Sequence, residues 1–324
     1  MKHRGWILAG FALAAWGGVA LAPYFGVVSL SDLRAIPVFW QIRVPRVLLA
    51  FLAGSGLAMA GMTFQALFRN PLATPFTLGV SSGAAFGATA AIRLGWTASL
   101  LGVSAVSLSA FAGALASLVL VYGVAMARST FSTSALLLAG AAISFFFWSL
   151  ILFIQYLSDF TSSFRILRWL MGGLETVGYG AVLDVLPFVI SGSAVILCFT
   201  RELNLMAAGE DLAVSRGVQV GVVRAVLFSA STLMVGGVVA LCGPIGFVGM
   251  MAPHICRLLI GTEHRHLAPA TFLFGGLFLL ACDAVARLLI APAEIPVGVI
   301  TALLGGPFFV WLLLRRPSAG DSPV

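Results

Sequence analysis

Residues 43–83, RVPRVLLAFLAGSGLAMAGMTFQALFRNPLATPFTLGVSSG, decide the fold of this chain. The apolar run at 47–68 has few polar residues, and at ~1.5 Å per residue it can cross a ~30 Å hydrocarbon core as a helix. Pro71 and Pro75 then stop the helix. A second apolar run, rich in Gly and Ser, begins at Phe76, and such small residues let membrane helices approach closely. The stretch predicts a membrane helix, a tight polar turn and a second membrane helix.

The composition extends this prediction to the whole chain. Of 324 residues, 60% are hydrophobic and 9% charged, and the mean hydropathy is +1.09, whereas about a quarter of the residues of a soluble domain are charged. We therefore expect an all-α polytopic membrane protein, one transmembrane domain over residues 1–324. About ten transmembrane helices are predicted, at 6–28, 44–68, 76–92, 99–127, 133–157, 181–200, 223–244, 246–261, 267–290 and 296–314. Segment 246–261 is short and contains Pro253, so a broken or re-entrant segment is the alternative there.

Several function classes are excluded. The net charge is +7, but the arginines are scattered singly, so no basic stripe for nucleic acid exists. Lys2 is the only lysine, which excludes a Walker A phosphate loop. Any ATP hydrolysis must come from another polypeptide. No nucleophile–base pair or cofactor loop is visible, so we expect neither an enzyme nor a resident cofactor.

The cysteines and histidines do not predict a metal site. Cys198, Cys242, Cys256 and Cys282 lie in or beside apolar runs without CxxC spacing, where thiols usually act as small packing residues. His254 and Cys256 are two residues apart and point to nearly opposite sides of a helix. His264 and His266 fall in a predicted cytoplasmic turn, without a recognised ligand spacing.

Charge distribution predicts the orientation. With both termini in the cytoplasm, most basic residues obey the positive-inside rule. Residues 1–28 resemble a signal peptide, but their apolar run exceeds the ~7–15 residues of such a segment, so we expect a retained first membrane helix. The outer side receives Arg34, Arg43, Arg46, Arg93, Arg165, Arg168 and Arg287. This number exceeds what topology favours and indicates a function for these arginines.

Two of the polar segments between the predicted helices are long. Residues 159–180 mix aromatic and charged side chains, which favours an outer interfacial helix. Residues 201–221, RELNLMAAGEDLAVSRGVQVG, lie inside and contain a short helix that has Glu210 and Asp211 near its start and Gly217 after its end. This loop is too apolar for a solvated linker. It either docks a cytoplasmic partner or packs against its own membrane domain.

Seven motifs, in this order, resemble the FecCD-type permeases, the membrane subunits of ABC importers for iron–siderophores, haem and cobalamin. They are RVPR (43–46), QALFRNPLA (65–73), LGVSSGA (78–84), WLMGGL (169–174), GEDLAVSRGV (209–218), GPIGFVGMMAPHICRLLIGTEHRHLAP (243–269) and EIPVGVITALLGGPFFVWLLLRR (294–316). The resemblance covers about residues 43–316. It implies a type II ABC importer permease fold, transport by alternating access and a location in the inner (plasma) membrane of a bacterium. Which chelate is carried is not readable from the chain.

The resemblance also implies partners and sites. It implies a second permease copy, as a homodimer or with a related permease, two cytoplasmic ATPase subunits and a periplasmic substrate-binding protein. The helices matching 133–157 and 296–314 line the pathway at the dimer axis. The arginines matching Arg43, Arg46 and Arg287 face the binding protein, at an exposed rim. Coupling to the ATPase is implied for Leu205, Met206, Gly209, Glu210, Asp211, Arg216 and Gly217.

Alternatives remain beside the resemblance. Arg43 and Arg46 could extend to lipid head groups, and Asp283 could pair with Arg287 four residues later on one helix. The glycines at 172–173 and 305–306 could be hinges or close-packing residues. An ion-coupled secondary carrier is the alternative function, but it would normally keep ionisable residues at mid-membrane. The carboxylates Asp159, Asp184, Asp283 and Glu294 all map near helix ends or outer loops.

Overall fold

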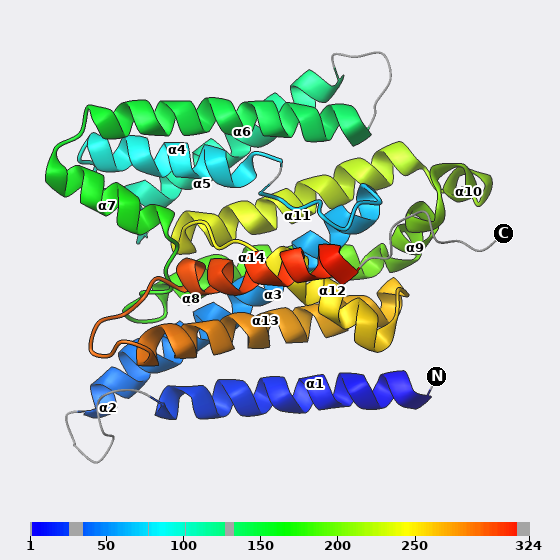
Figure 1. The fold of residues 1–324 in the computed structure, drawn as a ribbon, viewed down its shortest axis with the longest axis horizontal. Coiled ribbons are helices and arrows are strands. Elements are labelled where there is room, and N and C mark those ends of the chain that lie inside the picture. Colours follow the sequence, from blue (N-terminus) through cyan, green and yellow to red (C-terminus); the bar gives the residue numbers. More distant parts are fainter. Residues whose placement is uncertain (1, 26–34, 77, 101, 127–132, 316–324) are drawn as a thin grey trace.

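The computed structural model describes residues 2–25, 35–76, 78–100, 102–126 and 133–315. Arg34 and residues 26–28 of the first predicted helix lie outside them. The helices run along the long axis of one bundle (Figure 1), and the strands β1 (Ser99–Leu100) and β2 (Val103–Ser104) form a small antiparallel hairpin. The predicted all-α fold is confirmed. The helices are α1 (Lys2–Leu21), η1 (Ala22–Tyr24), α2 (Ala35–Val38), η2 (Phe39–Arg43), α3 (Val44–Leu67), α4 (Val80–Arg93), α5 (Ala105–Met126), α6 (Thr133–Tyr156), α7 (Phe160–Leu170), α8 (Gly180–Cys198), α9 (Thr200–Ala208), α10 (Glu210–Ser215), α11 (Val220–Cys242), α12 (Val248–Ile260), α13 (His264–Leu288) and α14 (Val297–Arg315).

Each of the ten predicted apolar segments contains a helix, but their lengths differ. Within the described residues, seven helices are long and apolar enough to cross a membrane. The second of them extends over Ile36–Leu67, eight residues earlier than predicted. Pro45 explains the irregular turn at the junction between η2 and α3, because a proline clashes with the carbonyl four residues before it. The π turn η2 precedes Pro45, and Val44 N–H bonds the Phe39 carbonyl five residues back.

α12 is a short helix. Its 13 residues span about 20 Å at ~1.5 Å per residue, less than the ~30 Å of a hydrocarbon core. Residues 243–247 precede it without helical structure, and in Figure 1 they lead from the end of α11 back to the start of α12, beside α3. The structure therefore favours the broken alternative for segment 246–261.

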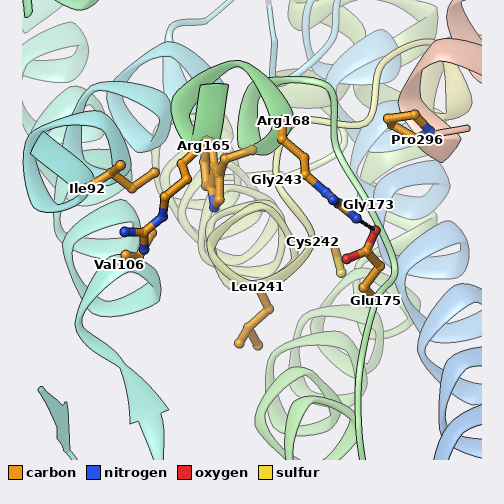
Figure 2. A pocket seen from close by; sticks show the side chains of 11 residues that line it. Ile92, Val106, Arg165, Arg168, Gly173, Glu175, Leu241, Cys242, Gly243 and Pro296 are labelled. Carbon is orange, nitrogen blue, oxygen red and sulfur yellow. Dashed lines mark hydrogen bonds and ion pairs between the residues drawn. The ribbon is translucent and has the colours of Figure 1, made fainter. Parts of the chain in front are cut away.

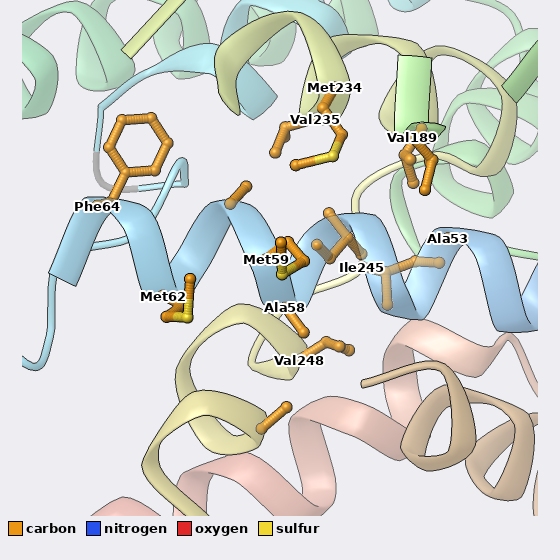
Figure 3. Close-up of a cluster of buried hydrophobic side chains, with 14 of the residues drawn as sticks. Ala53, Ala58, Met59, Met62, Phe64, Val189, Met234, Val235, Ile245 and Val248 are labelled. Carbon is orange, nitrogen blue, oxygen red and sulfur yellow. The ribbon is translucent and has the colours of Figure 1, made fainter. Parts of the chain in front are cut away.

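α3 is the centre of the bundle. Twenty of its 24 residues are buried, and it packs against α8, α11, α12 and α13. Figure 3 shows Phe64 and Met59 of α3 among side chains of α8, α11 and the segment before α12. This all-round burial explains why the sequence of α3 has an apolar character without a polar face.

Small residues set the distances between these helices. A Cβ at Gly61 of α3 would lie 1.8 Å from the Gly249 carbonyl oxygen of α12, and a Cβ at Gly54 would lie 2.3 Å from that of Gly275 in α13. No larger residue fits at either crossing. The close approach predicted for the second apolar run is present between α4 and α5, where a Cβ at Gly83 would lie 2.4 Å from the Gly113 carbonyl oxygen.

The bundle has two ends, which we name after the helices there. The α7 end holds α2, α7 and the connection from α13 to α14 (Figure 1). The α10 end holds α9, α10, the start of α1 and the turn between α12 and α13. The predicted site residues divide between these two ends.

Candidate functional site

At the α7 end, a buried charge cluster joins α3, α13 and the segment before α14. Arg46 Nε donates to Asp283 Oδ1 at 2.9 Å, and Arg46 Nη1 donates to Glu294 Oε2 at 2.7 Å. Arg287 Nε lies 3.0 Å from Asp283 Oδ2. Asp283 has no exposed surface, so its charge depends on these two guanidinium groups.

Arg43 extends the cluster toward the end of the first helix. Its Nη1 donates to the Pro23 carbonyl at 3.3 Å, and Arg287 Nη1 donates to the Phe25 carbonyl at 3.2 Å. We use the name outer cluster for Arg43, Arg46, Asp283, Arg287 and Glu294. It has three arginines and two carboxylates, a formal charge of +1. It ties η1, α3, α13 and the α13–α14 connection together.

The three predicted docking arginines do lie together, but they do not form an exposed rim. Arg43, Arg46 and Arg287 are 6%, 8% and 9% exposed. That part of the prediction is wrong for the single subunit, because the arginines bind carboxylates and carbonyls of their own chain. The predicted Asp283–Arg287 ion pair is confirmed. The ion pairs of Arg46 with Asp283 and Glu294 were not predicted, although charged residues in membrane helices usually pair with an opposite charge.

Two cavities lie beside α7. One, of about 310 Å³, is lined by residues of α4, α5, α7 and α11 and includes Arg165, Trp169 and Cys242 (Figure 2). The other, of about 620 Å³, lies between α7 and the α13–α14 connection and includes Phe164 and Glu294. Arg168 and Glu175 line both. These two side chains form an exposed ion pair.

The helix α7 at this end has a defined start. Asp159 is its N-cap and accepts hydrogen bonds from the backbone N–H groups of Thr161 and Ser162. Hydrogen bonds from Ser162 lower the pKa of the Asp159 carboxyl. The hydrogen bond with Glu175 raises the pKa of Arg168 near the helix end. The predicted helix within 159–180 is present.

At the α10 end, the predicted coupling residues are only partly accessible. Asp211, Arg216 and Gly217 are exposed, whereas Leu205 is partly buried. Met206 is buried and packs in the core. For Met206 the structure favours the packing alternative, because α9 turns that side chain toward the bundle.

Glu210 and the two glycines have structural roles in the same loop. Glu210 forms an ion pair with Arg224 of α11, so one acidic group of the pair Glu210 and Asp211 is already engaged within the chain. Gly209 has φ +152° between α9 and α10, and Gly217 has φ +80° after α10. Both values lie in the region that favours glycine. We use the name α10 surface for the exposed residues Asp211, Leu212, Val214, Ser215, Arg216 and Gly217.

A polar groove of about 600 Å³ lies beside α9 and was not predicted. Arg257 of α12 donates to the Gln65 side chain of α3. Asn204 Oδ1 accepts from His264 N–H at 2.9 Å and lies 2.7 Å from His264 Nδ1. The only signal in the sequence was the presence of Gln65 and Arg257 inside apolar runs.

The described histidines of α12 and α13 and the buried cysteines take part in packing and hydrogen bonding. His254 lies edge-on to the Phe308 ring, and Cys256 is buried. Among the residues that the structure describes, no three His, Cys, Asp or Glu side chains lie together as metal ligands. The geometry of the described chain therefore offers buried ion pairs and cavities at its ends.

Comparisons with known proteins agree with this architecture. The FecCD transport family matches residues 6–315. The chain is 43% identical over 279 residues to the vitamin B12 import system permease protein BtuC of Escherichia coli O157:H7, strain EC4115, covering 85% of this chain and 83% of that protein. It is 39% identical to the uncharacterized ABC transporter permease protein YvrB of Bacillus subtilis, strain 168, over 92% of this chain and 84% of that protein.

A solved structure matches nearly the whole chain. An inward-facing conformation of a putative metal-chelate type ABC transporter superposes with a TM-score of 0.86 and 35% identity, covering 97% of this chain and all of that one. The family match and these relatives cover the same helices that form the bundle. The chain therefore belongs to the FecCD transport family and is the membrane-spanning permease subunit of an ABC importer.

Proposed function

We propose that the chain carries a metal chelate of the cobalamin type across the inner membrane. The observation that carries this proposal is its 43% identity, over most of both chains, to a vitamin B12 import permease. The likeness to a metal-chelate type transporter supports the wider class. Iron–siderophores and haem are the other members of the predicted substrate class.

The motor is a separate pair of ATPase subunits that bind the α10 surface in the cytoplasm. The chain has one lysine, Lys2, and therefore lacks a Walker A loop. Asp211 and Arg216 are exposed beside apolar Leu212 and Val214. Exposed apolar groups rimmed by charge are typical of protein interfaces.

A second permease copy completes the pathway as a homodimer. The resemblance puts the helices matching α6 and α14 at the dimer axis, and large apolar side chains on both remain exposed in the single subunit, so these faces are free to pack against a second copy. These residues are Phe145, Phe146, Leu152, Phe153, Leu303, Leu304, Val310 and Trp311. A pathway between the two copies alternates between outward and inward access as the ATPases work.

The binding protein docks at the α7 end, in the periplasm, near Arg43, Arg46 and Arg287. Since Arg46 already holds Glu294, a docking carboxylate must compete with Glu294 or bind the remaining N–H groups of the outer cluster. Glu294 is exposed, so it can exchange for another carboxylate without opening the bundle. Glu294→Gln should therefore speed docking at low salt, because charge complementarity acts mainly on the association rate. An unchanged rate would remove the outer cluster from the docking site.

The test is uptake by proteoliposomes that contain the permease, its ATPase subunit and ATP, with the binding protein outside. Labelled cobalamin, a ferric siderophore and haem are supplied separately. We expect ATP-dependent uptake of cobalamin, unaffected by ionophores that collapse proton and sodium gradients. Uptake of only another chelate would overturn the cobalamin assignment. Uptake that needs a gradient but no ATP would support the ion-coupled carrier instead.

A further inference from the structure

Phe247, the residue before α12, has an unusual backbone conformation. Its φ is +66° and its ψ is −26°, in the left-handed region. Within the described residues, Arg69 is the other non-glycine with positive φ. The short helix α4 starts from the same region, but the residue there is Gly79. An aromatic residue at such a position indicates that its ring makes a contact glycine could not supply.

That contact is with the middle of α14. A Cβ at Gly305 would lie 2.1 Å from Phe247 Cγ and 2.2 Å from Cδ1, so the ring fills the space that any side chain at 305 would need. Phe309, one turn further on the same face, has its ring centroid 6.3 Å from that of Phe247. Gly305 and Phe309 thus form a notch on α14 that receives the ring.

Two other contacts hold α14, one near its start and one near its middle. At its start, a Cβ at Gly298 would lie 2.1 Å from the Met171 carbonyl oxygen, a close approach. Further along, Phe308 lies against His254. Leu303 and Leu304, beside Gly305, are exposed. The ring of Phe247 therefore supports the centre of the helix together with the His254–Phe308 contact.

A cavity adjoins the same ring. It measures about 200 Å³ and is lined by Leu57, Thr74, Pro75, Phe76, Gly246, Phe247, Gly249 and Met250. An apolar cavity of ~150 Å³ accepts a benzene molecule. The Phe247 ring therefore has room to leave the notch without displacing α3 or α12.

We propose that Phe247 is a positioning residue for transport, whose ring fixes the middle of α14 by sitting against Gly305 and moves into the adjoining cavity when α14 moves. This rests on the proposed function, in which α14 borders the pathway. The ring and notch would give α14 two discrete positions, which packed interiors favour over continuous deformation.

The test compares Gly305→Ala with Gly306→Ala in the complete importer. Both add one methyl group to adjacent positions of α14, but a Cβ at Gly306 meets no atom within 4 Å. We expect Gly305→Ala to reduce chelate uptake per ATP hydrolysed at least fivefold and Gly306→Ala to change it less than twofold. The double variant Phe247→Gly with Gly305→Ala removes the clash but also the ring, so we expect this ratio to stay reduced at least fivefold, and recovery to the wild-type ratio would contradict a positioning role for Phe247.

A second measurement does not need the substrate. In a Cys198→Ser background, Leu303→Cys on the exposed face of α14 is labelled with a membrane-impermeant maleimide. Gly305→Ala should change the labelling rate at least threefold, Gly306→Ala should not, and Phe247→Gly should reverse the change. Equal rates in Gly305→Ala and Gly306→Ala, or no reversal, would overturn the inference. Failure of all chelate uptake with the expected labelling rates would instead refute only the substrate proposal.

Discussion

At the α7 end, Arg46, Asp283 and Arg287 lie inside the bundle and bind one another, whereas at the α10 end Asp211 and Arg216 are exposed. Arginine and aspartate side chains are therefore expected to contribute differently to folding stability at the two ends. Removing one member of a buried pair leaves an uncompensated charge and costs about 3–5 kcal/mol. Exposed charges contribute ~0–1 kcal/mol to folding. The role proposed for Asp211 and Arg216 at the α10 end is binding of the ATPase, and the following variants separate the two cases.

The largest effect is expected from Asp283→Ala. It leaves Arg46 and Arg287 buried without their shared carboxylate, which should reduce the free energy of unfolding by about 3–5 kcal/mol. Thermal unfolding of the purified permease in detergent measures this. Asp283→Asn keeps the shape but not the charge and should behave similarly. Wild-type stability in both variants would show that the arginines do not depend on Asp283.

A smaller effect is expected from Glu210→Gln. This change weakens the ion pair with Arg224, which is largely buried while Glu210 is half-exposed. A hydrogen bond to a charged group contributes about 1.5–3 kcal/mol, and Gln retains part of it, so a loss of about 1 kcal/mol is expected. The adjacent Asp211→Asn is the matched control and should leave stability unchanged. If the two variants unfold at the same temperature, the Glu210–Arg224 pair does not hold α10 against α11.

The smallest effect is expected from Glu175→Gln. The ion pair with Arg168 is exposed on both sides, so its loss should change stability by ~0–1 kcal/mol, and added salt should remove the difference. Unfolding measured at low and high ionic strength tests this. A loss as large as that of Asp283→Ala would mean that exposure does not decide the contribution of charges at the α7 end.

The sequence predicted the helices better than their contacts. The length of the apolar run and the prolines located α3 within a few residues, because both signals are local. The Arg46–Glu294 pair joins positions 248 residues apart, and no local pattern in one sequence encodes such a contact. Burial of Met206 was missed for the same reason, since which face of α9 meets the bundle depends on tertiary packing. The left-handed conformation of Phe247 contradicts its local preference and could not be predicted.

The two ends can be compared directly with Arg46→Gln and Arg216→Gln, which remove the same charge from each. For each variant, thermal unfolding of the permease and its affinity for the ATPase subunit are measured. We predict a crossed result. Arg46→Gln should lower the free energy of unfolding by about 3 kcal/mol or more and leave the affinity for the ATPase subunit unchanged. Arg216→Gln should weaken ATPase binding about tenfold, ~1.4 kcal/mol, and change the free energy of unfolding by no more than ~0.5 kcal/mol. Equal losses of stability in the two variants, or ATPase binding weakened only by Arg46→Gln, would contradict the division of roles between the two ends.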